Sequence, residues 1–207
     1  MEETPASLHI RPEDQCAVII AHPDDETLWV GGVIIAHPYA DWTIVSLCRE
    51  SDPDRAPKFL KACRFYGAGG FIGDMDDGPE QKPLPDAEVR DTIMHLLPRR
   101  QFDFIFTHGK GGEYTRHRRH EEVSRAVSNL YREQRIRSRH LLLFAYEDGG
   151  GKYLPRPDSG AGILFPLTPA GWETKRWVMT IVYGFSPESW EAKTTPRQEA
   201  FVTYDGG

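Results

Sequence analysis

The sequence contains few cysteines and no apolar segment long enough to cross a membrane. Its three cysteines, Cys16, Cys48 and Cys63, form no CxxC pair among the 207 residues. This pattern argues against a cysteine-ligated metal site and favours buried thiols in a reducing cytoplasm. No apolar run approaches the ~20 residues of a transmembrane helix, and the mean hydropathy is -0.52. We therefore expect no membrane partner.

A surplus of positive charge is also missing. The formal net charge is -6, which argues against a general nucleic-acid binder. The N-terminal residues are acidic and carry no apolar core, so they do not resemble a signal peptide. Apolar residues make up 39% and charged residues 27% of the chain, as in a globular protein. The length fits one hydrophobic core, and we expect residues 1–207 to form a single domain.

Short apolar segments alternate with segments of helical periodicity along most of the chain. The expected strands are 17–21, 43–48, 70–73, 102–107 and 141–145. The expected helices are 26–37, 57–66, 86–97 and 119–134. This alternation predicts an α/β fold with a largely parallel, doubly wound sheet. The remaining predictions are a loose arm at 1–15, a surface loop at 146–172, a sixth strand at 177–183, a short helix at 187–193 and a polar tail.

The turn between the first expected strand and helix carries an unusual set of polar side chains. It reads Ala-His-Pro-Asp-Asp-Glu over residues 21–26. Ligands of open α/β sheets bind at such turns, and a cation would relieve the repulsion among Asp24, Asp25 and Glu26. The alternative is a helix cap, with Asp24 or Asp25 as the N-cap and His22 as an ordinary loop histidine.

Two further histidines follow the fourth expected strand. His117 and His120 are three residues apart at the start of a helix, so they can share one face. In the predicted sheet both turns emerge at the same edge, which would bring His22 and Asp25 close to this pair. Two histidines and a carboxylate around an open position are a common ligand set for catalytic zinc. The alternative is a pair of solvated histidines in an arginine-rich helix start.

The two motifs together resemble those of the PIG-L/LmbE-like deacetylase family. The matching residues are Ala-His-Pro-Asp-Asp-Glu at 21–26, Gly-Glu-Tyr at 112–114 and His-x-x-His at 117–120, within a resemblance over roughly residues 16–145. The resemblance implies a Rossmann-like three-layer sandwich. It also implies a metal-dependent hydrolase that removes an N-acetyl group from an amino sugar or a related small conjugate. The implied cofactor is Zn²⁺, with Fe²⁺ as the alternative because both suit this ligand set.

The resemblance also assigns roles at the reacting centre. His22, Asp25 and His120 would hold the metal. Asp24 would be the general base that takes a proton from water, which the metal makes more acidic. His117 would donate a hydrogen bond to the oxyanion or protonate the leaving amine.

Four further residues are implied around the substrate. Tyr114 is a second candidate for the oxyanion. Arg55, Asp77 and Glu50 could hold substrate hydroxyl groups.

The sequence departs from the family pattern in three ways, one of which is that Tyr114 lies one residue farther from His117 than is usual. Arg119 stands where the family commonly has an aspartate between the two histidines, and Lys58 replaces an acid. A cation at 119 would disfavour a protonated His117. The alternative function is therefore a ligand-binding protein of the same fold whose catalytic site has degenerated.

Arginines are concentrated between residues 116 and 139. The segment contains eight, namely Arg116, Arg118, Arg119, Arg125, Arg132, Arg135, Arg137 and Arg139. They could attract an anionic N-acetylated substrate, or serve a metal-dependent phosphoesterase, although no phosphate-cradling glycine loop of known type is present. The alternative is a solvated helix face.

Overall fold

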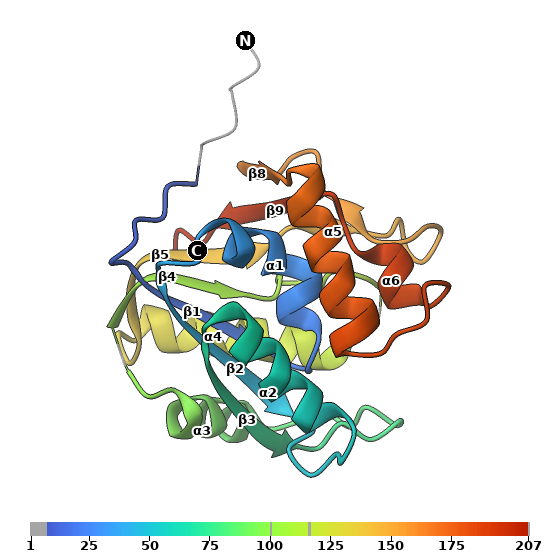
Figure 1. Ribbon diagram of the computed structural model, residues 1–207. Helices are drawn as coiled ribbons and strands as arrows, with labels where there is room; N and C mark the ends of the chain where they lie inside the picture. The colour runs from blue at the N-terminus through green and yellow to red at the C-terminus, as the bar shows by residue number, and fades with distance from the viewer. Residues whose placement is uncertain (1–7, 100, 116, 207) are drawn as a thin grey trace.

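A seven-stranded sheet runs through the centre of the molecule between two layers of helices (Figure 1). The computed structural model describes residues 8–99, 101–115 and 117–206. The sheet has the order β3-β2-β1-β4-β5-β9-β8. Its strands are β1 (Gln15–Ile20), β2 (Asp41–Cys48), β3 (Gly69–Met75), β4 (Gln101–Thr107), β5 (Arg137–Phe144), β8 (Ile163–Pro166) and β9 (Gln198–Thr203). The first five strands of this order are parallel, whereas β9 is antiparallel to both β5 and β8.

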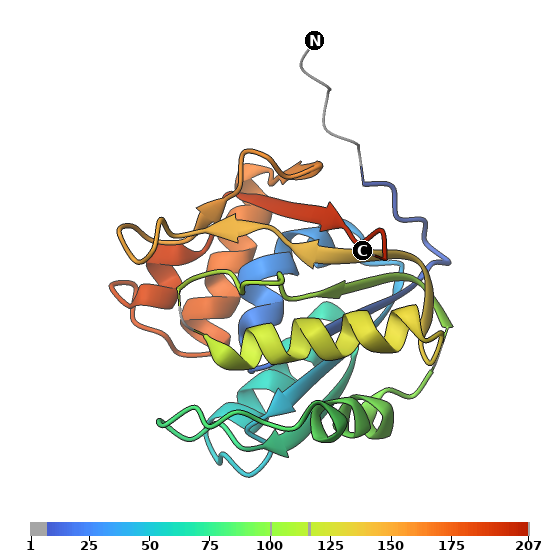
Figure 2. The same ribbon diagram turned by 180° about the vertical axis from the view of Figure 1, so that it is seen from behind.

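Helices cover both faces of this sheet. They are α1 (Asp25–Ala36), α2 (Arg55–Tyr66), α3 (Asp86–Leu96), α4 (Arg118–Arg132), α5 (Pro169–Trp177) and α6 (Trp190–Thr194). Helices α1, α2 and α5 lie in front of the sheet in Figure 1, and α3 and α4 lie in front in the reverse view of Figure 2. The side chains of β1 alternate accordingly, because Val18 and Ile20 join the core under α1, whereas Ala17 and Ile19 join the core under α4. The expected α/β three-layer fold with a largely parallel sheet is confirmed.

Local sequence signals explain where α2 ends and why α1 is buried. Helix α2 stops at Gly67, whose φ of 68° is in the left-handed region that glycine tolerates. Helix α1 is buried along most of its length, as its apolar sequence predicts. Its Gly32 packs closely against Leu167, since a Cβ there would lie 2.6 Å from that side chain. The glycine pair of α1 therefore allows close packing against neighbouring segments rather than against the sheet.

The C-terminal third differs from the sequence-based expectation. The predicted strand at 177–183 is wrong, because the chain continues from α5 into a π-helical turn, η1 (Val178–Val182). Apolar side chains there are buried at helical spacing, with Val178, Met179 and Val182 inside and Ile181 60% exposed.

The predicted loop at 146–172 and the polar tail also contain regular structure. The loop includes β6 (Tyr146–Glu147), β7 (Arg156–Pro157), β8 and the start of α5, and the tail contains β9. The short helix expected at 187–193 is α6, displaced by a few residues. Of the predicted arm, residues 8–14 form no helix or strand, although Asp14 is buried, and residues 1–7 lie outside the described part.

The strand order reverses between β1 and β4, which are neighbouring parallel strands. The chain proceeds from β1 to β2 and β3 on one side, and from β4 to β5 on the other. Ligands of doubly wound sheets bind at the carboxyl ends of the strands at such a point. None of the helices in the described part of the chain is both long enough and apolar enough to span a bilayer.

Candidate metal centre

The turns that follow β1 and β4 meet at this carboxyl edge. The turn after β1 contains His22, Asp24 and Asp25, and the segment after β4 contains His108 and the start of α4. A hydrogen bond joins the two, because the Ala21 N–H donates to His108 Nε2 at 2.9 Å. The predicted meeting of the two motifs is therefore observed.

Asp24 occupies the N-cap position of α1 without acting as a cap. Its side chain makes no capping hydrogen bond, and its φ of 104° is in the left-handed region. Its amide donates to Glu26 Oε2 at 3.0 Å instead. A non-glycine residue held in this region costs of order 1–3 kcal/mol, and such strain is concentrated at functional sites. The helix-cap interpretation of Asp24 therefore fails.

Three acceptor atoms converge beside this turn. His22 Nδ1 lies 3.3 Å from His120 Nε2 and 3.3 Å from Asp25 Oδ2, and the remaining edge of the triangle is 3.4 Å. Tetrahedral ligands at about 2.0–2.1 Å from a zinc ion are themselves about 3.3–3.4 Å apart. The triangle thus has the dimensions of one face of a tetrahedral metal site, so these residues fit a divalent metal.

Glu113 decides which nitrogen of His120 faces the triangle. Its carboxylate is buried and accepts from His120 Nδ1 at 2.5 Å and from His108 Nδ1 at 2.9 Å. The Gly109 N–H donates to its other oxygen. A histidine that donates one N–H to a carboxylate presents the unprotonated nitrogen on the opposite side, as metal-binding histidines do. His120 therefore directs an unprotonated Nε2 at Asp25 and His22.

His22 and Asp25 are held in a similar way. His22 Nε2 lies 3.1 Å from Asp77 Oδ1, which leaves Nδ1 facing the triangle. Asp25 Oδ1 accepts from the Trp29 indole at 3.0 Å, and its Oδ2 accepts from the His22 amide. All three ligand candidates are thus oriented by partners outside the triangle.

Other histidines surround the triangle. His120 belongs to two groups whose ligand atoms lie within 4.8 Å of one another, one with His22 and His117 and one with Asp25 and His108. The ring of His108 is already engaged at both nitrogens, by Ala21 and by Glu113. His108 and Glu113 were not among the predicted site residues, although the Gly-Glu-Tyr motif was a signal for the second.

The electrostatics of the acidic turn differ between its two aspartates. Burial, reinforced by the charge of Asp25, raises the pKa of Asp24 well above its usual range, against the opposing charge of Arg55. Arg55 donates to Asp24 Oδ2 at 3.1 Å. The pKa of Asp25 is lowered well below its usual range, because the charges of His120 and its neighbours outweigh burial. Asp24 is therefore the more basic carboxylate of the pair.

His117 stacks on His120, and Tyr114 packs edge-on against both rings. The His117 ring lies 4.1 Å from that of His120 and 4.6 Å from that of His22 between centroids. Burial, together with the neighbouring imidazoles, lowers the pKa of His117 to about 3. Burial also raises the pKa of Tyr114, whose ring contacts both His117 and His120. Both side chains thus line the site in neutral form.

A pocket of about 260 Å³ opens from this cluster. Its walls combine the predicted residues His22, Asp24, Asp25, Arg55, Asp77, Tyr114 and His117 with Pro23, Leu28, Arg49, Trp190 and Glu191. Glu50 is exposed and does not line it, so its predicted substrate contact is not supported. Arg49 lines the pocket instead and bonds Asp77 through Nε at 2.9 Å. Arg49 has a positive φ of 76°.

Arg119 points away from the histidines. Its guanidinium is buried and donates to Glu122 at 2.6 Å and to the Asp76 carbonyl at 2.5 Å. Glu122 in turn accepts from the Leu84 amide. The expected effect on His117 is not seen, because burial and the neighbouring imidazoles account for its lowered pKa. Arg119 instead fastens the 76–84 segment, which carries Asp77, to α4.

The other arginines of the basic segment do not form a patch at the pocket. Arg125 pairs with Asp86 and Arg139 with Asp103, both away from the cluster. Arg118 is exposed, and Arg116 lies outside the described residues. The solvated-face interpretation therefore fits the described arginines of this segment other than Arg119.

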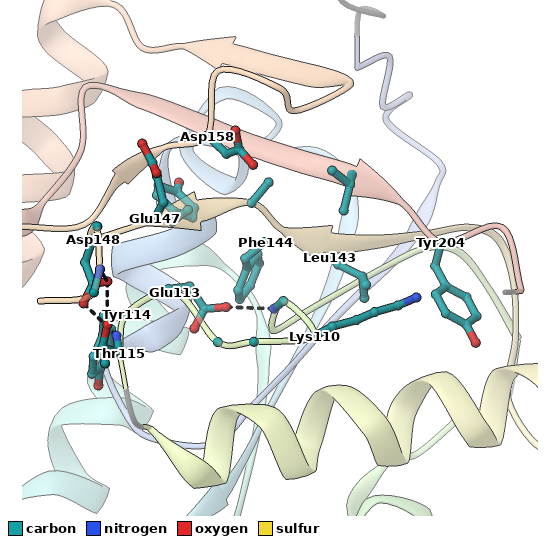
Figure 3. A pocket seen from close by; sticks show the side chains of 18 of the residues that line it. Lys110, Glu113, Tyr114, Thr115, Leu143, Phe144, Glu147, Asp148, Asp158 and Tyr204 are labelled. Carbon is teal, nitrogen blue, oxygen red and sulfur yellow. Dashed lines mark hydrogen bonds between the residues drawn. The ribbon is translucent and has the colours of Figure 1, made fainter.

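A larger hollow of about 810 Å³ lies between the glycine-rich loop after β4 and the ends of β5 and β9 (Figure 3). Its volume exceeds that of the pocket, but the two buried carboxylates in its wall are already engaged. Asp148 accepts from Thr115 through both the amide and the hydroxyl at 2.7 Å, and Glu113 is committed to the histidines. Figure 3 shows the Asp148–Thr115 hydrogen bonds, which join the segment after β6 to the glycine-rich loop. The hollow thus offers no converging set of ligand atoms among the described residues.

The family comparison covers both motifs. A family model described as PIG-L: GlcNAc-PI de-N-acetylase matches residues 17–131, more than half of the chain. No curated protein matches the sequence.

Solved structures share the fold at low sequence identity. The conserved protein TT1542 from Thermus thermophilus is 20% identical, with a TM-score of 0.59 over 92% of this chain and 94% of that chain. GalB, the 4-carboxy-2-hydroxymuconate hydratase from Pseudomonas putida KT2440, is 13% identical, with a TM-score of 0.58 over 91% and 95%. A zinc-inhibited form of teicoplanin deacetylase Orf2 is 12% identical, with a TM-score of 0.59 over 93% and 99%. At these identities the likeness concerns the fold alone.

Proposed function

This chain belongs to the PIG-L family, and on that basis we propose that it is a metal-dependent hydrolase that removes an N-acetyl group from an amino sugar or a related small conjugate. The family model is that of a de-N-acetylase, which supports amide hydrolysis. The fold alone does not select this reaction, because GalB, a hydratase, shares it. The substrate is therefore inferred from the family and the site together.

The observation that carries the proposal is the triangle of His22 Nδ1, Asp25 Oδ2 and His120 Nε2. The three potential ligand atoms lie 3.3–3.4 Å from one another, which is the separation expected around one tetrahedral metal ion. Zn²⁺ and Fe²⁺ both suit two histidines and one carboxylate. When bound, the metal would supply a Lewis acid that polarises the amide carbonyl and brings the pKa of water to about 7.

Asp24 is the proposed general base. Its carboxylate lines the pocket next to the triangle, and Arg55 fixes its direction. It would accept a proton from the water that attacks the amide carbonyl, and the C–N bond would then break to give acetate and an amine. The amine must regain a proton, which Asp24 can return.

His117 and Tyr114 are the proposed donors to the oxyanion. Both line the pocket and contact the ring of His120. A protonated phenol and an imidazole N–H can each donate to developing negative charge. Arg55, Asp77 and Arg49 stand at the rim, where they could hold substrate hydroxyl groups; Arg49 takes the place first given to Glu50.

Metal content tests the first half of the proposal. Protein purified without chelator is expected to contain about one divalent metal ion per chain by elemental analysis. Metal-free protein should regain activity with one equivalent of Zn²⁺ or Fe²⁺. Excess zinc must be tested separately, since a related deacetylase is known in a zinc-inhibited form. A chain that contains no metal and takes none up on titration would refute the metal centre.

Acetate release tests the second half. A panel of N-acetylated amino sugars should yield acetate and amine in equal amounts, and Asp24→Asn should abolish the release while leaving metal content unchanged. The binding-protein alternative predicts ligand binding without acetate, and a phosphoesterase would release phosphate instead. The binding alternative was motivated by Arg119, which the structure places away from the histidines.

A further inference from the structure

A short aromatic segment, Tyr183-Gly184-Phe185, follows the π-helical turn η1 and approaches the acidic turn from the C-terminal part of the chain. Helix α5 runs alongside α1 in Figure 1, and η1 contacts both α1 and α2. The Tyr183 amide donates to the Val178 carbonyl at 3.0 Å. The Phe185 amide donates to the Met179 carbonyl at 3.2 Å. Gly184 has a φ of 75°, in the left-handed region that glycine tolerates. The two aromatic side chains therefore extend from a fixed backbone.

Tyr183 reaches the backbone of Asp24 through Glu26. Its hydroxyl donates to Glu26 Oε1 at 2.7 Å, and Glu26 Oε2 accepts from the Asp24 amide at 3.0 Å. The Thr27 hydroxyl donates to the same Oε1 at 2.6 Å. Tyr183 and Glu26 are both buried. Because a buried carboxylate is costly without its donors, these hydrogen bonds hold Glu26 in place, and Glu26 in turn holds the Asp24 amide.

Phe185 reaches the carboxylate of Asp24 through Arg55. The guanidinium carbon of Arg55 lies 4.6 Å from the centroid of the Phe185 ring. Arg55 also donates to Asp24 Oδ2 at 3.1 Å. Attraction between the cation and the aromatic face restricts the guanidinium to this position beside the carboxylate. Asp24 is therefore held at its amide and at its carboxylate by contacts that begin in one short segment.

We propose that Tyr183 and Phe185 are positioning residues that direct the general base Asp24 toward the attacking water. Glu26 and Arg55 connect them to the amide and the carboxylate of that base. The inference rests on the role of Asp24 in the proposed function. Asp24 needs such support because its φ of 104° is costly for a residue other than glycine. Single π-helical turns are frequent at functional sites, and η1 directly precedes this segment. Both aromatic residues lie outside the part of the chain that the family model matches.

Hydrogen exchange followed by nuclear magnetic resonance tests the amide contact without any turnover. In Tyr183→Phe the Asp24 amide is expected to exchange about tenfold faster relative to the amides of the core strand β1, because Glu26 has lost one of its donors. Tyr146→Phe is the matched control. It removes another buried tyrosine hydroxyl, which donates to the Trp29 carbonyl of α1, and it should leave this ratio of exchange rates unchanged.

Steady-state kinetics with N-acetylglucosamine measures what the two contacts contribute to the reaction. Tyr183→Phe should lower kcat per metal-loaded chain about tenfold while KM changes less than about twofold, because a misdirected base slows only the chemical step. Tyr146→Phe should keep both constants. Phe185→Leu should lower kcat about three- to tenfold, whereas Phe185→Tyr, which keeps the aromatic face, should retain it. The two Phe185 variants decide the inference if Tyr183→Phe does not fold.

The outcomes separate this inference from the proposed function. Faster exchange at Asp24 in Tyr183→Phe, without acetate release by the unaltered protein, would support the positioning of Asp24 and count against the deacetylase. Acetate release with exchange and kcat unchanged in Tyr183→Phe would overturn the positioning role and leave the deacetylase intact. Equal effects in Tyr183→Phe and Tyr146→Phe would also overturn it, since they would indicate a general loosening of the fold. A kcat as low in Phe185→Tyr as in Phe185→Leu would overturn the role of the aromatic ring.

Discussion

The pocket of about 260 Å³ at the histidine cluster and the hollow of Figure 3 share Tyr114 in their walls, and the smaller of the two contains the proposed metal site. The hollow has about three times the volume, 810 Å³ against 260 Å³. The two buried carboxylates of the hollow, Glu113 and Asp148, lie apart and are held by donors within the fold, whereas potential ligand atoms of His22, Asp25 and His120 lie 3.3–3.4 Å from one another. Convergence of potential ligand atoms, rather than volume, distinguishes a metal site from a surface depression.

The largest expected effect comes from replacing one aspartate at the histidine cluster and comparing it with the replacement of one aspartate in the hollow. Asp25→Asn should abolish metal retention and lower acetate release by about 10³-fold or more, because the charged ligand is lost. Asp158→Asn in the hollow should change neither, since Asp158 is exposed. Elemental analysis after dialysis and acetate assays measure both. Equal losses in the two variants would contradict the distinction.

Arg119 borders the cluster, but we assign it a role in stabilising the fold rather than in the reaction. Arg119→Met should lower the free energy of unfolding by about 3–5 kcal/mol, because the buried Glu122 carboxylate loses its cation. Arg125→Met is the matched control, with an effect below about 1 kcal/mol, since Arg125 is exposed and pairs with Asp86 at 3.5 Å. Urea denaturation followed by circular dichroism measures both. A stable Arg119→Met protein that has lost activity would instead indicate a role at the site.

Glu113 lines the hollow but acts on the cluster, so it defines the boundary between them. Glu113→Gln should weaken metal affinity about 10- to 100-fold, because His120 loses the carboxylate that fixes its tautomer. Glu147→Gln, in the same hollow, should leave the affinity unchanged, since Glu147 pairs with the exposed Arg156, away from the histidines. Competition with a metal-binding dye gives both constants.

The smallest expected effect is a change in the pH dependence of unfolding when Asp148 is replaced. Hydrogen bonds from Thr115 and from neighbouring amides outweigh burial and lower the pKa of Asp148. Its contribution to stability is therefore full above the unfolded pKa of about 4 and is lost as the pH falls through the lower folded value. In Asp148→Asn the unfolding midpoint should depend less on pH in this acidic range, and metal content should stay constant. Loss of metal from this variant would contradict the conclusion that Asp148 plays no part in metal binding.

Sequence patterns predicted the parallel half of the fold because its signals are local. Strand β1 is continuously apolar, and helix α2 ends at a glycine in the left-handed region. The first motif also indicated a cation site, since three adjacent acids after a buried strand are otherwise repulsive. The π-helical turn after α5 was mistaken for a strand, because a nearly continuous apolar run fits either periodicity.

Strand β9 was not predicted from the sequence, for a different reason. Its Glu199 is typical of an exposed polar position, yet it is buried, accepting from Lys175 Nζ at 2.5 Å and from the Gly32 and Val33 amides. These partners come from α5 and α1, far away in the chain. A buried charge whose partners are far away in the chain cannot be recognised from the neighbouring sequence.

The amino-acid sequence by itself determined the family, the parallel α/β layout and the identity of the residues proposed for the reacting centre. Only the tertiary structure decided their geometry. It turned Arg119 toward Glu122, exchanged Glu50 for Arg49 at the pocket wall and placed Glu113 behind His120. Residue type and order follow the chain, but the direction of a side chain depends on partners that folding brings from elsewhere.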